Sequence, residues 1–236
     1  MRCIVHRDQH IYQCSQEFRI LDEYLAYIEG SINVILKDII LKLQSKEEYI
    51  ECDDDQTVGY YFDGLVLPDS AAMIFSRFLY NNYFLSLWAT YETGLKEIAM
   101  FLSLALGSDN YNQYMGKKDF ITAIFKYFKD IYKIDIPTVN QINQEYLRYL
   151  YKLRNVIAHG NGRTEDVSKK NEDLVKWILK QPEITVSEDG WILLNDKFDR
   201  SIYEGLSFSF ERLCRLAYEH APDAAPRPVK RFIIHY

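Results

Sequence analysis

Apolar residues near the N-terminus recur at alternating steps of three and four, which is the spacing of one face of a helix. The stripe consists of Phe18, Leu21, Leu25, Ile28, Ile32, Ile35 and Ile39. We therefore expect a long first helix over about residues 15–48, in which Gly30 costs about 1 kcal/mol relative to alanine. The segment 51–68 contains acids and glycines without this period, and it predicts a loop with room for a short strand.

A second long helix is predicted from Asp69 or Ser70, which supplies the N-cap, to about Gly107. Its stripe is unusual because two of its members, Asn81 and Glu92, are polar. The full stripe is Ile74, Phe78, Asn81, Leu85, Trp88, Glu92, Leu95, Ala99 and Leu102.

The rest of the chain predicts shorter elements. We expect helices over about residues 117–132, 138–159, 171–180 and 200–220. Alternating apolar residues around Asp189-Gly190 predict a β-hairpin over about 184–194. The proline-rich residues 222–236 are expected to be a peripheral tail. The prediction is therefore one all-α domain over residues 1–236, an antiparallel helical bundle with one small β-hairpin insertion.

Composition and charge narrow the class of protein. With 48% hydrophobic and 26% charged residues, 10 glycines and 6 prolines, the chain is globular in character. A formal net charge of -6 argues against the broad basic face that duplex DNA requires, so no duplex DNA partner is expected. The acid run Asp53–Asp55 fits a solvated loop better than a cation site.

The cysteine spacing bears on metal and redox sites, and the apolar runs bear on membrane insertion and cellular location. Cys3, Cys14, Cys52 and Cys214 form no C-x-x-C pair, which favours reduced thiols over a metal or redox site. The first ten residues contain no signal-peptide core, and the longest apolar run, IAMFLSLALG, is too short to span a bilayer. We expect a cytoplasmic protein with no membrane contact, no metal site and no cofactor.

One stretch of this acidic chain is basic. Residues 147–163, LRYLYKLRNVIAHGNGR, contain four basic side chains and a histidine but no acid. On an ideal helix the core face consists of Val139, Ile142, Tyr146, Leu150, Leu153 and Ile157, and a second stripe nearly opposite consists of Arg148, Lys152, Asn155 and His159. Arg154 lies between the two faces. Because His159 lies on the stripe opposite the core, it is predicted to face solvent or another molecule.

Two interpretations of this helix end stay open. Gly160 suits the position after a helix C-terminus, and cations there gain about 0.3–1 kcal/mol from the helix dipole. On that view Arg154 and His159 only complete a helix end. On the other view they form a reactive site, because an imidazole with an unperturbed pKa of about 6.5 exchanges protons near neutral pH.

The residues RNVIAH, Arg154 to His159, resemble the R-x4-6-H motif of the HEPN superfamily, in which a polar residue often follows the arginine, as Asn155 does here. The earlier segment FLYNNYFLSLWATYETGLKEIAMFL also resembles the long acid-containing helix of that family. The resemblance covers about residues 69–163 and the final helix. It implies a HEPN-like bundle and a metal-independent endoribonuclease, in which two subunits place their motifs across a two-fold axis and RNA is cut between them. Many members are toxins, with an antitoxin partner, or phage-defence effectors, and others are inert.

The chemistry of metal-free RNA cleavage suits these residue types. The ribose 2′-OH attacks, so a base and an acid must move protons, which is histidine's role in catalysis. A permanently charged, bidentate arginine suits the phosphorane. His159 and Arg154 are the candidates for these roles, with Asn155 orienting the ring or the phosphate. The candidate RNA-binding cations are Arg148, Lys152 and Arg163.

Two questions remain open at this stage. Arg154 and His159 lie about 140° apart on an ideal helix, so either the last turn loosens at Gly160 or a second subunit completes the site. Glu92 either holds Arg154 or pairs with Lys96 one turn later on its own helix. The function is accordingly either an RNase or a non-catalytic HEPN-like module that dimerises and binds a nucleotide or a partner protein.

Overall fold

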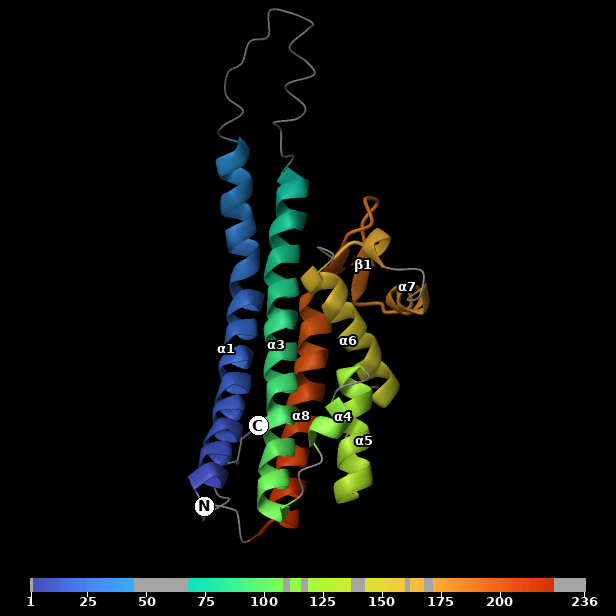
Figure 1. Ribbon diagram of the computed structural model, residues 1–236. Helices are drawn as coiled ribbons and strands as arrows, with labels where there is room; N and C mark the ends of the chain where they lie inside the picture. Colours follow the sequence, from blue (N-terminus) through green and yellow to red (C-terminus); the bar gives the residue numbers. More distant parts are fainter. Residues whose placement is uncertain are drawn as a thin grey trace, which may run out of the picture.

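A computed structural model describes residues 2–44, 68–107, 111–115, 119–136, 143–159, 162–167 and 172–222. It is mostly helical with one small two-stranded antiparallel hairpin, which confirms the predicted fold class (Figure 1). Three long helices, α1 (Arg2–Gln44), α3 (Pro68–Leu106) and α8 (Asp196–His220), form the body of the molecule. The shorter helices α4 (Tyr111–Met115), α5 (Phe120–Tyr132), α6 (Gln144–His159) and α7 (Glu172–Ile178) lie beside them.

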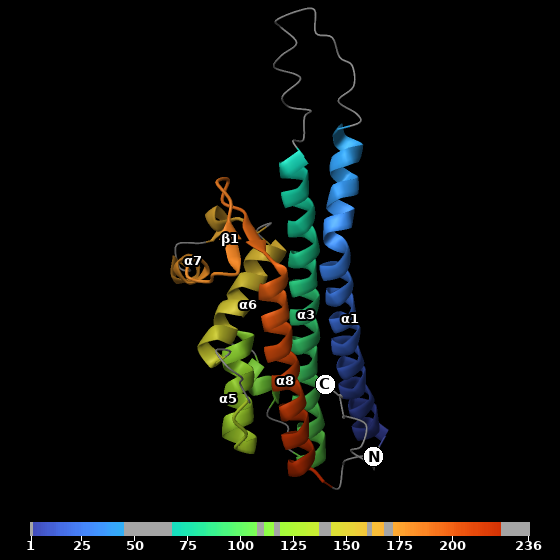
Figure 2. The ribbon, with the colours of Figure 1, turned by 180° about the vertical axis from the view of Figure 1, so that it is seen from behind.

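Helix α3 lies between α1 and α8 in both views, with α1 antiparallel to it and α8 parallel (Figures 1 and 2). Large apolar side chains fill the space between the three helices, as in Phe18 of α1 and Phe210 of α8, whose ring centroids are 5.2 Å apart. Gly94 of α3 lies directly against the Phe210 ring. Tyr91 and Ser209 add a buried hydrogen bond of 3.1 Å between α3 and α8.

Helix α1 begins at Arg2, so the predicted start near residue 15 is wrong. The error arises because polar residues on the first turns of α1 have partners on other helices. Arg7 donates to Glu97 of α3 at 2.9 Å, and Tyr218 of α8 donates to Asp8 at 2.6 Å. The loop expected over 51–68 lies outside the described residues, apart from Pro68.

Three helix starts also differ from the predictions. Asp69 and Ser70 both lie inside α3, which begins with Pro68, a residue suited to the first helical position. Asn143 caps α6 by accepting a 2.8 Å hydrogen bond from the Tyr146 amide, so this helix begins later than residue 138. Asn195 caps α8 in the same way, and α8 therefore begins before residue 200. Residues 137–142 lie outside the described part of the chain.

Strands β1 (Ile184–Val186) and β2 (Ile192–Leu194) pair with Thr185 opposite Leu193, which confirms the hairpin. Gly190 adopts a φ of +78°, which explains the glycine in the turn. Beside the hairpin, Arg163 forms an isolated antiparallel bridge with Trp191. The chain that leaves α6 is thereby attached to the hairpin.

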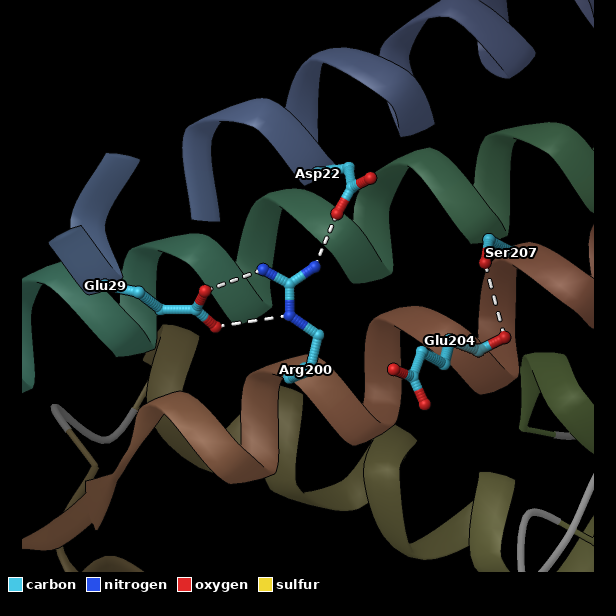
Figure 3. A network of polar contacts seen from close by, with 5 residues as sticks. All are labelled: Asp22, Glu29, Arg200, Glu204 and Ser207. Atoms are coloured by element: carbon cyan, nitrogen blue, oxygen red, sulfur yellow. Dashed lines mark hydrogen bonds and ion pairs between the residues drawn. The ribbon is translucent and has the colours of Figure 1, made fainter. Parts of the chain in front are cut away.

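Ion pairs on the outside of the bundle join α8 to α1. The Arg200 guanidinium lies between the carboxylates of Asp22 and Glu29 of α1, and both carboxylates accept from it (Figure 3). The thiols of Cys14 and Cys214 are buried and free. Within the described residues, no helix has the length and apolar character needed to cross a membrane. The predicted tail, residues 222–236, lies outside the described chain beyond Pro222.

Candidate active site

The C-terminal part of α6 presents the HEPN-like residues at the surface. Leu147, Leu150, Leu153 and Ile157 are buried and fix the rotation of the helix. With that face inward, Arg154 is half-buried and His159 is exposed, as the helical pattern predicts. Asn155, predicted on the solvent-facing stripe, is half-buried as well. The helix continues to His159, so on ideal geometry Arg154 and His159 remain about 140° apart.

Asn155 contacts Arg154. The Nη1 of Arg154 donates to the Oδ1 of Asn155 at 2.9 Å. This bond holds the guanidinium against the helix surface, which restricts its rotamers. Among the described residues, Arg154 has no ion pair with a carboxylate.

The two cations earlier on α6 have partners on neighbouring helices. The Nζ of Lys152 donates to Asp173 of α7 at 2.6 Å, and this hydrogen bond lowers the pKa of the Asp173 carboxyl. The Nε of Arg148 donates to the hydroxyl of Thr122 of α5 at 3.1 Å. Lys152 and Arg148 therefore help to dock α7 and α5, while Arg148 remains exposed.

Glu92 adopts the alternative arrangement. Its carboxylate accepts from Lys96, one turn later on α3, at 2.7 Å. The Lys96 ammonium also lies 5.0 Å from the Phe120 ring centroid of α5. No hydrogen bond or ion pair joins Glu92 to Arg154 in the described part of the chain. The predicted role of Glu92, to hold Arg154, is therefore not supported by any contact among the described residues.

Arg163 lies in a cluster that sequence patterns do not reveal. Its guanidinium carbon is 4.4 Å from the centroid of the Trp191 ring, and the guanidinium carbon of Arg77 is 3.8 Å from the same centroid. We name Arg77, Arg163 and Trp191 the Arg–Trp cluster. Its members come from α3, from the segment after α6 and from the hairpin, so no local motif could have identified it.

Backbone hydrogen bonds fix the Arg–Trp cluster to the end of α6. The Gly162 amide donates to the Val156 carbonyl of α6 at 3.2 Å, and the Gly162 carbonyl accepts from Ile192 at 2.8 Å. Gly162 has a φ of +74°, and a Cβ there would lie 3.5 Å from the side-chain nitrogen of Asn81 of α3. Arg163 is thus held four residues beyond His159 by both α6 and the hairpin.

The polar groups around this point are incompletely partnered. The Nε of Arg163 and the Oδ1 of Asn81 are buried without a hydrogen bond. Burial and the nearby charge of Arg163 lower the pKa of the Arg77 guanidinium. Neither Arg77 nor Arg163 pairs with a carboxylate among the described residues. Two close cations without an acid favour the binding of an anion.

Comparisons with known protein families, with curated proteins and with solved structures find no match to this chain. The likeness of Arg154–His159 to the HEPN motif therefore rests on the sequence pattern, and the roles of these residues are argued from their surroundings. Among the described residues, no three His, Cys, Asp or Glu side chains gather as the ligands of a metal ion do.

Proposed function

We propose that this protein is a HEPN-type endoribonuclease that cleaves RNA by attack of the 2′-OH at the end of α6. The proposal rests on one observation: of the half-buried arginines in the described chain, some pair with a carboxylate and others do not. Arg7 and Arg200 are paired with carboxylates. The other three, which lack a carboxylate partner, lie around the end of α6, and they are Arg77, Arg154 and Arg163. In an acidic chain this arrangement supports a site for a polyanion.

Each side chain has a role that its surroundings suit. His159 is exposed and can transfer a proton to or from the reacting oxygens. Arg154, oriented by Asn155, can stabilise the charge that develops on the phosphorane. The Arg–Trp cluster offers a second phosphate position along the RNA backbone. Arg148 is exposed and can contact RNA further along the surface.

A second subunit is part of this proposal. Since α6 continues to His159, the helix itself turns Arg154 and His159 away from each other. A two-fold axis near the exposed end of α6 would place two motifs on either side of one cleft. The scissile phosphate would then contact groups from both subunits.

Cleavage of RNA by matched variants tests the proposal. His159→Ala should lose at least about 100-fold in rate, the lower end of a general acid–base contribution. Arg154→Ala should also lose at least about 100-fold, the lower end for removal of one group that stabilises transition-state charge. His220→Ala and Arg212→Ala replace exposed residues of α8 and should retain the wild-type rate. Circular dichroism of all four variants should match the wild type, because none of the four replaced side chains is buried in the core.

Two outcomes would overturn the proposal. Full activity in His159→Ala would remove the histidine from the mechanism. Absence of cleavage by the wild type across total RNA, transfer RNA and single-stranded oligonucleotides would instead favour the non-catalytic module that dimerises and binds a nucleotide or a partner.

A further inference from the structure

The outer face of α1 carries apolar residues at every seventh position. Ile20, Tyr27, Val34 and Leu41 are between 55% and 70% exposed. The opposite face of the helix is buried in the core through Phe18, Leu25, Ile28 and Ile32. An exposed apolar stripe with a seven-residue repeat supplies one of the two apolar positions per heptad found in helices that pair with other helices.

The same outer face has a second set of positions, three residues after Ile20, Tyr27 and Val34. These are Glu23, Gly30 and Lys37, and all three are exposed. A Cβ at Gly30 would have nothing within 4 Å, so no contact within the described chain requires a glycine there. A glycine in the middle of an exposed helix costs about 0.5–1 kcal/mol. It does, however, allow another backbone to approach closely.

We propose that α1 pairs with α1 of a second copy of this chain, antiparallel, about a two-fold axis at Gly30. With a rise of about 1.5 Å per residue, Glu23 and Lys37 lie about 10.5 Å on either side of that axis. Glu23 of each copy therefore faces Lys37 of the other. By the same geometry Tyr27 lies beside the other copy's Val34, and Ile20 beside its Leu41, within about 1.5 Å along the helix.

Charge complementarity within one helix identifies the partner as a second copy. A two-fold interface must be complementary to itself, and the positions around Gly30 meet this condition. A parallel pairing would place Glu23 against Glu23 and Lys37 against Lys37, which is unfavourable. Asp38 and Lys42 are already paired with each other, whereas Glu23 and Lys37 have no ionic partner among the described residues.

In the described part of the chain, no other helix or strand lies over this face of α1. In both views α1 lies at the edge of the bundle, and α6 and the hairpin lie on the far side of α3 and α8 (Figures 1 and 2). The α1 interface is therefore separate from the cleft proposed at the end of α6, and the inference does not rest on the RNase function.

Light scattering of the purified 236-residue chain tests the pairing. At high micromolar concentration the wild type should have at least twice the 28.0 kDa mass of one chain. Glu23→Lys and Lys37→Glu should each halve the wild-type mass, and the double variant Glu23→Lys/Lys37→Glu should restore it. Glu219→Lys, a reversal on exposed α8, is the matched control and should leave the mass unchanged. A wild type of 28.0 kDa, or single variants with the wild-type mass, would overturn the proposal.

Cysteine cross-linking tests the antiparallel orientation. Gly30→Cys lies on the axis, so two copies should form a disulfide, which needs Cα atoms about 4.4–6.8 Å apart. Ile20→Cys lies about 30 Å from its own symmetry mate in the antiparallel pair and should not cross-link to itself. Self-linking of Ile20→Cys, or no linking of Gly30→Cys, would contradict this arrangement.

Discussion

Replacement of Gly94 by alanine should destabilise the bundle, although alanine is the better helix former. A Cβ at this position would lie 2.5 Å from Cε2 and 2.9 Å from Cδ2 of Phe210, closer than carbon atoms approach without displacement. Phe210 is only 1% exposed and packs against Phe18, so a displacement of its ring also disturbs the packing against α1. The contact between α3 and α8 therefore has to widen or distort.

The change in the free energy of unfolding caused by Gly94→Ala is the balance of two opposing effects. Overpacking a filled core costs about 1–3 kcal/mol. The gain in helix propensity from glycine to alanine is about 0.8–1 kcal/mol. With two ring carbons inside contact distance, the upper part of the overpacking range applies, and the net loss is about 2 kcal/mol. For a chain of this size that corresponds to a Tm lower by about 4–8 °C.

Urea unfolding followed by circular dichroism measures this loss. Gly94→Ala, Phe210→Leu and the double variant form a cycle, in which the double variant should be at least about 0.5 kcal/mol more stable than additivity predicts. Gly30→Ala in the Glu23→Lys background is the control, because a Cβ there meets nothing, and it should be stabilising. A stabilised Gly94→Ala, or strict additivity in the cycle, would refute the packing argument.

Three further predictions concern individual side chains. Both carboxyl oxygens of Asp199 are buried without a hydrogen bond, and burial, with Asp196 and Glu29, raises its pKa well above the usual value. The folded state therefore keeps a proton that the unfolded state releases above about pH 3.9, so the stability of the wild type falls as pH rises. Asn cannot ionise, so the Tm of Asp199→Asn relative to that of the wild type should increase from pH 4 to pH 8. A Tm difference that does not change with pH would contradict this. Arg77→Ala should weaken binding of a 2′-O-methyl RNA and reduce the slope of log affinity against log salt by about 1, measured by fluorescence anisotropy, whereas an unchanged slope would remove Arg77 from the RNA path. Glu92→Gln should retain wild-type cleavage, because its carboxylate binds Lys96 instead of Arg154, and a large loss of rate would restore the supporting role.

Local patterns predicted the elements whose signals are local. The hairpin follows from alternation around Gly190, whose positive φ the structure confirms. Gly107, with a φ of +66°, ends α3 where the sequence predicts. The buried stripe of α6 predicts the exposure of His159 correctly. In each case the residues that determine the conformation are within a few positions of one another.

Features that depend on distant partners were missed. The first turns of α1 carry Arg7 and Asp8 on faces that pack, and only Glu97 and Tyr218 explain why these polar residues are tolerated. The Arg–Trp cluster joins three segments, so its chemistry is invisible along the chain. For Glu92, the sequence left two partners open, Arg154 and Lys96, and the structure selects Lys96.

The chemistry of the cleaved ends tests the central proposal most directly. An RNA oligonucleotide and the same oligonucleotide with one 2′-deoxyribose at the scissile position would be incubated with the wild type in excess EDTA. Attack by the 2′-OH predicts cleavage of the first to a 2′,3′-cyclic phosphate, or its hydrolysed form, and a 5′-OH, with resistance of the second. Cleavage at the deoxy position, 5′-phosphate ends, or loss of activity in EDTA would contradict the mechanism assigned to Arg154 and His159.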